Sequence, residues 1–448
     1  MSMLSQNLKK TIQNMHTIPW KLYLSVLLTH LLPTIYVTIR IYFLGDLPSD
    51  WGVNIASQLV WISLVLEVIQ EGLILPLFYI IGKTSKDRNE TINKVKTGLL
   101  ITIGIHVLIL AIVGIFTPAF VRAMAQNPAL QDATVVYIRL ELISLLIQSV
   151  FKFLFILFII YDQRVTIYLL LLVQMIGTVI LDTFFVSSFS FSLNLGVNGI
   201  AYSNIIIYSL LVGMSIYRAI RTFKLTKKDW RVHTSFTWLK EWGRVGGYSA
   251  MDSFIRNLFY MVFIIRMMNI IAEQGTYWVA NGFIWSWLLL LVYPLTDIIK
   301  QKIATTLPEK LKGFLNPYYL FSTIIVLLWF LTMPGWMWFI TKVLNAAEPQ
   351  TVFRLVLLLL PAYISFVYNT VADALFYAIG KTESLAIQTI LTNISVYGIA
   401  FILFITGNFI PTLYSIAILF SIGIVIDGIL TFILLRYYIR KYEMNSTH

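Results

Sequence analysis

Hydrophobic residues occur along this chain in long, nearly uninterrupted runs, which short polar segments separate. A helix needs about 20 mostly apolar residues to cross the hydrocarbon core of a bilayer. The runs are too long and too uniform for the alternating strands of a transmembrane β-barrel. The pattern therefore predicts twelve membrane-spanning helices, at about 20–44, 54–81, 95–116, 135–160, 165–187, 196–220, 245–270, 276–299, 314–340, 352–379, 384–406 and 411–436.

The composition agrees with this pattern. Of the 448 residues, 58% are hydrophobic and only 12% are charged, whereas a soluble protein carries about 25% charged residues. So little charge cannot cover a water-exposed surface of this size, which excludes a soluble enzyme. The chain has no cysteine, which excludes a disulfide-stabilised scaffold. The predicted class is an all-α polytopic membrane protein.

The basic residues predict the orientation of the spans. Most of the 33 Lys and Arg residues fall in alternate connecting segments, and the opposite connections hold only Arg122 and Lys342. Cytoplasmic loops accumulate Lys and Arg. We therefore expect a multi-pass protein of the plasma (inner) membrane with both termini in the cytoplasm. The net charge of +12 is then a topology signal, and we expect no nucleic-acid partner.

The longest basic segment divides the chain near its middle. It predicts an N-terminal six-helix bundle at 1–222, a basic cytoplasmic linker at 223–244 and a C-terminal six-helix bundle at 245–448. Leu-Pro-Leu at 75–77 recurs as Tyr-Pro-Leu at 293–295, as in an internal repeat. Six spans is an even number, so the two halves form a parallel pseudo-repeat. Such an architecture usually places a substrate cavity between the halves and opens it alternately to each side.

Motifs of catalysis are missing from the sequence. Gly-Lys-Thr at 82–84 and at 380–382 resembles the end of a phosphate-binding loop, but Leu77 and Leu375 stand where that loop needs a glycine. The five histidines form no H-E-x-x-H pattern. We therefore expect neither an enzyme nor a metal site, and no cofactor.

Ionisable residues inside the spans are the candidates for function, because they are costly in lipid and usually face a partner or a watered cavity. Glu67 and Glu71 are four residues apart and share one helix face, where their repulsion favours proton uptake by one of them. Asp252 and Arg256 have the same spacing and can pair along their helix. The remaining charges within the spans are Arg40, Glu141, Lys152, Asp182, Arg266, Asp297, Asp373 and Asp427.

Arg40 and Asp182 lie at similar predicted depth. Each is about five residues from the outer end of its span, at about 1.5 Å per residue. Their charges are opposite, so we expect them to pair. For each of these charged residues, the competing interpretation is an ion pair that only stabilises the bundle.

Several local patterns resemble the multidrug and toxic compound extrusion (MATE) family of secondary transporters. They are Glu-Gly-Leu at 71–73, followed by Ile-Gly-Lys at 81–83, the segment 127–139, Ile-Leu-Asp at 180–182 with Leu-Gly-Val-Asn-Gly-Ile-Ala at 195–201, and Ile-Gly-Lys-Thr at 379–382. The resemblance covers nearly the whole chain. It implies two six-helix bundles that form a V around a central cavity, and export coupled to inward Na⁺ or H⁺.

The chain departs from this family at two positions. By its spacing from Gly45, Arg40 stands where the family carries a cation-binding aspartate, and Arg256 stands at or near the place of a family glutamate. By the same mapping, Asp182 matches the family's aspartate in the fifth span, and Thr178 and Asn204 match its polar partners. We hypothesise that the Arg40 guanidinium replaces the family's carboxylate and its ion, and pairs with Asp182. Coupling would then move to Glu67, Glu71, Asp252 or Asp373, with H⁺ rather than Na⁺ as the coupling ion.

Three functions compete. The first is a monomeric secondary active exporter of small organic compounds by alternating access and proton antiport. The alternative is a flippase or exporter of an anionic or lipid-linked substrate, which Arg40, Arg256 and Lys152 would attract. The third is a membrane receptor or scaffold that transports nothing. A net negative lining of the cavity would indicate a cationic substrate, and a net positive lining an anionic one.

Overall fold

The computed structural model describes residues 11–47, 51–74, 76–82, 87–226, 228–231, 234–305, 311–379 and 381–445. Helices form the regular structure of these ranges, and no β-strand occurs in them. The predicted all-α class is therefore confirmed. Leu75 of the predicted repeat, and Lys83, Thr84 and Gly380 of the sequence motifs, lie outside the described residues.

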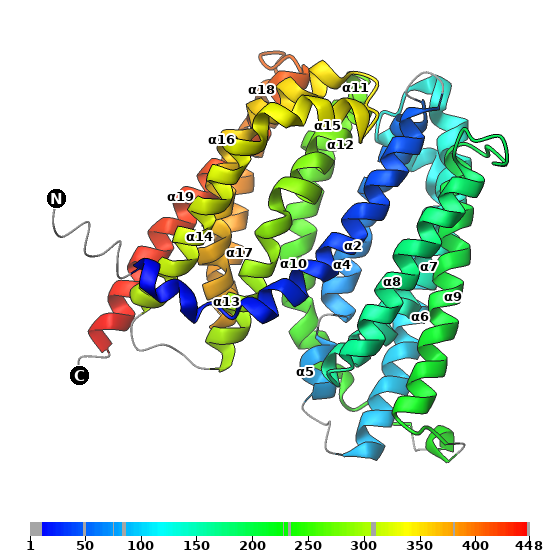
Figure 1. The fold of residues 1–448 in the computed structure, drawn as a ribbon, viewed down its shortest axis with the longest axis vertical. Coiled ribbons are helices and arrows are strands. Elements are labelled where there is room, and N and C mark those ends of the chain that lie inside the picture. Colours follow the sequence, from blue (N-terminus) through cyan, green and yellow to red (C-terminus); the bar gives the residue numbers. More distant parts are fainter. Residues whose placement is uncertain are drawn as a thin grey trace. The chain divides into compact units, whose positions relative to one another are not determined.

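Within the described ranges, eleven helices are long and apolar enough to cross a membrane, and twelve if the bent pair Gln274–Leu291 and Tyr293–Ile303 is one span. This agrees with the twelve predicted spans. The α-helices (Figure 1) are α2 (Trp20–Gly45), α3 (Trp51–Ser57), α4 (Leu59–Leu73), α5 (Leu77–Gly82), α6 (Arg88–Ala123), α7 (Gln131–Ile160), α8 (Arg164–Phe185), α9 (Val197–Thr222), α10 (Leu239–Tyr260), α11 (Arg266–Ile270), α12 (Gln274–Phe283), α13 (Tyr293–Thr305), α14 (Leu311–Thr332), α15 (Trp336–Lys342), α16 (Pro349–Ala378), α17 (Thr382–Asn393), α18 (Ile399–Ile405) and α19 (Leu413–Asn445).

Two spans differ from their predicted shape. The predicted span 276–299 is bent by 48°, and Pro294 lies at the bend. A proline has no backbone N–H to donate and its ring crowds the preceding turn, so it interrupts a helix. The predicted span 95–116 is longer in the structure, where α6 runs from Arg88 to Ala123. It begins about two turns earlier than predicted, because the Asp87 side chain accepts a hydrogen bond from the Glu90 backbone N–H and caps the helix.

The chain forms two compact units, unit 1 (Met1–Thr34 and Thr276–His448) and unit 2 (Ile35–Gly275). In unit 2, α7 packs against α6 and α9, α8 packs against α9, and α10 packs against α4. The predicted domains at 1–222, 223–244 and 245–448 follow the sequence halves, and they stay a prediction. The grouping of α10 with α4 is the structural fact that the site depends on.

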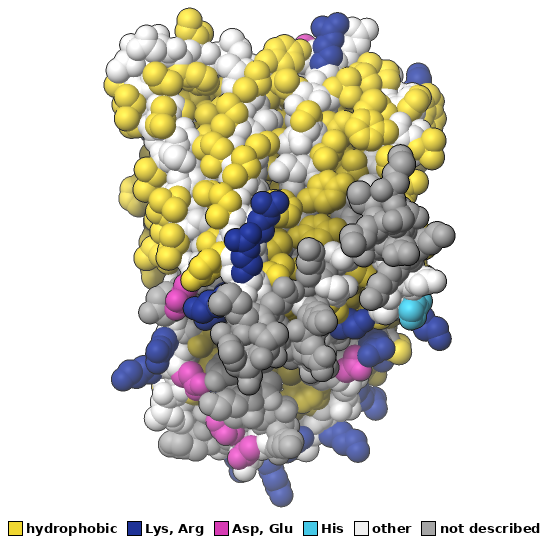
Figure 2. Space-filling model, turned by 90° about the vertical axis from the view of Figure 1, so that its left-hand side faces the viewer, with side chains coloured by type: hydrophobic (Ala, Val, Ile, Leu, Met, Phe, Trp, Pro, Cys, Tyr) yellow, Lys and Arg dark blue, Asp and Glu magenta, His cyan; other side chains and the backbone are white. Residues whose placement is uncertain are grey.

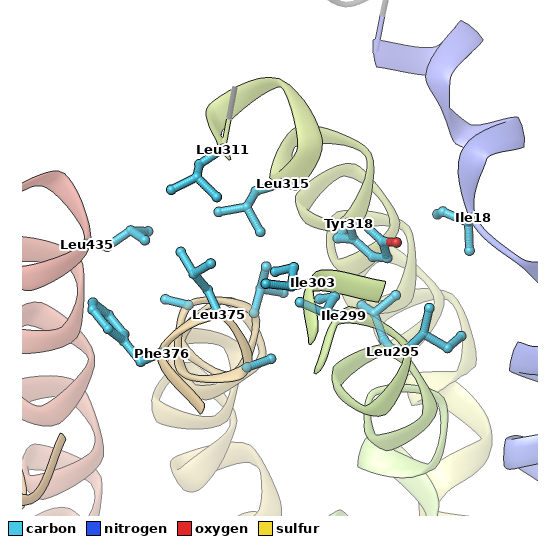
Figure 3. Packing of buried hydrophobic residues seen from close by; sticks show 14 of the residues in the cluster. Ile18, Leu295, Ile299, Ile303, Leu311, Leu315, Tyr318, Leu375, Phe376 and Leu435 are labelled. Atoms are coloured by element: carbon cyan, nitrogen blue, oxygen red, sulfur yellow. The ribbon is translucent and has the colours of Figure 1, made fainter. Parts of the chain in front are cut away.

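In unit 1, α16 packs against α13, α14, α15 and α19. Its core joins Leu295 and Ile299 of α13 with Tyr318 of α14, Leu375 of α16 and Leu435 of α19 (Figure 3). These side chains are nearly or fully buried, so they hold the helices together by the packing of apolar surface.

The surface fits a lipid environment. On the face in Figure 2, hydrophobic side chains cover a broad band, and most Lys, Arg, Asp and Glu side chains gather toward one end. Large apolar residues such as Leu100, Ile115 and Leu331 are more than half exposed. A contiguous apolar surface of this kind is typical of helices that contact lipid.

Candidate functional site

Arg40 and Asp182 form the ion pair that their predicted depth and opposite charge indicated. Arg40 lies on α2 and Asp182 on α8, both within unit 2. The Arg40 Nε donates to Asp182 Oδ2 over 2.8 Å, and Arg40 Nη2 donates to Asp182 Oδ1 over 3.3 Å. Two parallel bonds between a guanidinium and a carboxylate give a strong and directional pair. Only 1% of the Asp182 side chain is exposed, so the pair is shielded from bulk solvent.

A second buried carboxylate is linked to this pair. Arg40 Nη2 also donates to the Asn204 Oδ1 of α9 over 2.9 Å, and Asn204 Nδ2 donates to the Glu141 Oε1 of α7 over 2.8 Å. The Ser144 hydroxyl donates to the other Glu141 oxygen. One guanidinium thus serves two buried carboxylates, through one direct contact and one amide. We call Arg40, Glu141, Asp182 and Asn204 the Arg40 cluster.

Two of these four residues add to the predicted Arg40–Asp182 pair. Asn204 was predicted as a polar partner of the Asp182 site, and in the structure it accepts from Arg40 and donates to Glu141. Glu141 was recognised as a charge within a span but not selected for the site. Its predicted depth did not indicate a partner, because its partner on another helix, Asn204, is an uncharged amide. The sequence also does not specify which helices are neighbours. Thr178 is buried on α8 one turn before Asp182, on the same helix face.

A second charged cluster surrounds Arg256 on α10. Its Nη2 donates to Glu67 Oε1 over 3.1 Å and to Glu71 Oε1 over 3.3 Å, both on α4. Its Nη1 donates to Asp252 Oδ2 over 3.4 Å. The two helical pairs that the sequence indicated separately are therefore one group, which we call the Arg256 cluster (Glu67, Glu71, Asp252 and Arg256). With all three carboxylates ionised, it carries an excess of negative charge.

The two clusters differ in exposure. In the Arg256 cluster, 40% of the Arg256 side chain and 42% of the Glu67 side chain are exposed, whereas the Arg40 side chain is 15% exposed and Asp182 almost fully buried. The side chains of the Arg256 cluster are therefore partly exposed, whereas those of the Arg40 cluster are enclosed within unit 2.

The remaining candidates lie outside the hydrogen bonds of the two clusters. The Lys152 Nζ on α7 donates to the Gln70 side-chain oxygen on α4 over 3.0 Å, and its positive charge also interacts with Glu67 of the Arg256 cluster. In unit 1, Asn369 Nδ2 donates to Asp373 Oδ2 and to Asp427 Oδ2, each over 3.1 Å. Asp373 is thus linked to Asp427 of α19, a partner that the sequence did not single out.

No group of three or more His, Asp or Glu side chains in the described ranges is arranged to hold a metal ion. Around Arg256, the guanidinium itself occupies the centre of the three carboxylates. The chemistry that this group can perform is the exchange of protons and the attraction of positively charged molecules.

The close approach of α10 to α4 brings the Arg256 cluster together. A Cβ on Gly246 would lie 1.8 Å from the Gly72 backbone oxygen, whereas a Cβ on Gly247 would meet nothing within 4 Å. Only glycine at 246 therefore permits this helix contact.

Gly246→Ala should push α10 away from α4 and lower the free energy of unfolding by about 1–3 kcal/mol, as overpacking does. Thermal unfolding of the purified protein in detergent measures the change. Gly247→Ala is the matched control, and it should be neutral or slightly stabilising because alanine favours helix more than glycine does. Equal effects of the two variants would contradict the close contact.

Comparison with solved structures identifies the fold. An inward-facing multidrug resistance MATE family transporter of the MOP superfamily superposes with a TM-score of 0.75 and 16% identity, over 92% of this chain and 95% of that one. A Vibrio cholerae MATE transporter variant gives 0.65 and 14%, over 97% and 98% of the two chains. A MOP superfamily transporter from Pyrococcus furiosus, in which a reverse polarity of the binding pocket suggests a different function, gives 0.65 and 16%, over 96% and 98%.

No protein-family model matches the sequence, and no curated protein matches it. The likeness is therefore one of fold, and it is high along nearly the whole chain. The chain has the fold of the MATE transporters, as its sequence patterns indicated.

Proposed function

We propose that this protein is a secondary active exporter, which moves small organic compounds across the membrane by alternating access in exchange for protons. The observation that carries the proposal is the Arg256 cluster. It offers three carboxylates around one guanidinium, at side chains that are partly exposed within spanning helices. The MATE fold supports transport, since the chain matches such transporters over nearly their full length.

The charge of this cluster suits an exchange of protons for cations. Arg256 compensates one carboxylate charge, so protons and a cationic compound compete for the remaining negative charge. A site that binds either a proton or a substrate, and not both, couples the two movements in opposite directions. Ionisable residues of this kind within spans are typical of proton relays in transporters.

The Arg40 cluster supports H⁺ rather than Na⁺ as the coupling ion. The Arg40 guanidinium lies 2.8 Å from Asp182, where it supplies the positive charge that a bound metal ion would bring. A cation held by the chain itself cannot be exchanged. Coupling is then assigned to the more exposed carboxylates, Glu67, Glu71 and Asp252.

The alternative is a flippase or exporter for an anionic or lipid-linked substrate. In the Pyrococcus furiosus transporter of this fold, a reverse polarity of the binding pocket suggests a different function, so the fold is compatible with a change in pocket polarity. In this chain, however, both arginines donate to carboxylates, so their charge is already engaged. We therefore propose a cationic substrate.

We include in the proposal a monomer in the plasma membrane with both termini in the cytoplasm.

The direct test is efflux from proteoliposomes that contain the purified protein. The vesicles are loaded with ethidium as a cationic probe, or with carboxyfluorescein as an anionic probe, and an inward gradient of either H⁺ or Na⁺ is imposed. A gradient of one pH unit supplies about 1.4 kcal/mol per proton, which supports an about tenfold substrate gradient in one-for-one exchange. We expect ethidium efflux that follows the proton gradient and ignores the sodium gradient.

Three outcomes would contradict this proposal in different ways. Efflux that is insensitive to the pH gradient would remove proton antiport. A response to Na⁺ would remove the role assigned to Arg40. Export of carboxyfluorescein without export of ethidium would favour the anionic substrate.

A further inference from the structure

A large groove lies in unit 2, apart from both charged clusters. It has a volume of about 980 Å³, and α6, α7, α9 and the segment that follows α9 form its walls. The walls are mostly apolar, with Leu99 and Ile103 from α6, Leu154 and Leu157 from α7, and Ile216 and Ile220 from α9. A groove of this size and lining accommodates a flexible hydrocarbon chain.

One end of the groove carries charged side chains. Arg88 and Lys96 of α6, together with Lys224 and Asp229, line this end. The Arg88 Nη2 donates to Asp229 Oδ2 over 3.0 Å and also to the Lys224 backbone oxygen over 3.1 Å. This hydrogen bonding lowers the pKa of Asp229 to about 2, so the Arg88–Asp229 pair stays ionised and balanced at neutral pH. With Lys96 and Lys224, the basic residues that line the groove outnumber the acidic ones by three to one.

We propose that this groove binds an anionic phospholipid, with its phosphate at Lys96 and Lys224 and an acyl chain between α6, α7 and α9. From Lys96 to Ile103, α6 rises about 10 Å, so the groove holds the part of the acyl chain nearest the headgroup, within one leaflet of about 15 Å. The basic end belongs to the segments that the distribution of Lys and Arg predicts to be cytoplasmic. Basic pockets between spanning helices on that side are suited to anionic lipid headgroups.

Because of the position of the groove, a bound lipid should stabilise the packing of the helices in unit 2. Its walls come from three helices and from the segment that follows α9, so a bound lipid contacts all four at once. Binding to the folded protein alone raises its stability. The site needs no transport activity, and it can be tested independently of the proposed function.

Lipid binding is measured on the full chain by native mass spectrometry after titration with phosphatidylglycerol or with phosphatidylcholine. We expect phosphatidylglycerol to bind at least about tenfold more tightly, because basic residues near an anionic headgroup each contribute appreciably. The double variant Lys96→Gln/Lys224→Gln should remove this preference. Lys228→Gln is the matched control, because Lys228 is exposed in the same segment and does not line the groove.

A second pair of variants tests the apolar walls. Ile220 and Ile206 are each 44% exposed on α9, but only Ile220 lines the groove. Ile220→Trp should reduce the binding of both lipids, and Ile206→Trp should not. The proposal is overturned if both lipids bind equally, if the double lysine variant binds as the wild type does, or if inorganic phosphate displaces the lipid, which would indicate a site for free anions.

Discussion

Arg40→Leu should lower the free energy of unfolding by about 3–5 kcal/mol, the usual cost of removing one partner of a buried ion pair. The leucine leaves Asp182 buried and charged, and it also takes away the donor that Arg40 Nη2 offers to Asn204. Glu141 then stays buried with no cation linked to it through Asn204. Thermal unfolding in detergent, followed by loss of the monodisperse peak in size-exclusion chromatography, measures this effect.

Two further variants distinguish the loss of the ion pair from other effects of replacing an arginine. Arg40→Leu combined with Asp182→Leu should recover much of the lost stability, because two apolar residues of similar size can replace a buried pair at little cost. Arg256→Leu is the comparison in the more exposed cluster, where we expect a smaller loss of stability because solvent screens the charges there. If Arg40→Leu unfolds at the wild-type temperature, Arg40 is not the internal cation of this site.

The spans and the Arg40–Asp182 pair could be predicted from the sequence, because both depend on distances along a helix. A hydrocarbon core of fixed thickness requires long apolar runs, and a rise of about 1.5 Å per residue converts sequence position into depth. Two opposite charges at one depth are then expected to meet. The same reasoning identified Glu67 with Glu71 and Asp252 with Arg256 as pairs on single helix faces.

The parts that could not be predicted depend on which helices are neighbours. Arg256 joins both helical pairs because Gly246 lets α10 approach α4, and nothing in the periodicity of either helix indicates that contact. Glu141 was missed for a similar reason, because its partner Asn204 lies on α9 and carries no charge. The bend at Pro294 was foreseeable as an interruption, but its 48° angle depends on tertiary packing.

The predicted span was too short at α6 for a different reason. Its first turns hold Arg88, Glu90 and Lys94, so an apolar window begins only after them. Local capping by Asp87 and the Lys94–Glu90 ion pair of 2.9 Å extend the helix beyond the hydrophobic run. These polar turns also form the basic end of the groove. A search for apolar spans alone therefore does not reveal the basic end of the groove.

Glu67→Gln/Glu71→Gln should reduce proton-driven ethidium efflux at least about tenfold, which corresponds to about 1.4 kcal/mol. The change removes two of the three carboxylates around Arg256 and turns an excess of negative charge into a balanced Asp252–Arg256 pair. A charge pair about 4 Å apart near a protein surface contributes up to about 4 kcal/mol, so the lost attraction for a cation is large. Glutamine keeps the size and hydrogen-bonding capacity of glutamate, so the fold should be retained.

The matched control is Glu348→Gln/Glu383→Gln, which also removes two carboxylates, from exposed positions at the start of α16 and in the first turn of α17. This variant should transport as the wild type does.

The response of the Glu67→Gln/Glu71→Gln variant to pH distinguishes coupling from simple substrate attraction. Because only Asp252 of the three coupling carboxylates then remains, and it is paired with Arg256, residual efflux should respond to the proton gradient much less than in the wild type. If this variant instead keeps a full response to the proton gradient, neither glutamate is the coupling carboxylate. Asp252 is then the next position to replace, followed by Asp373, which is linked through Asn369 to Asp427 in unit 1.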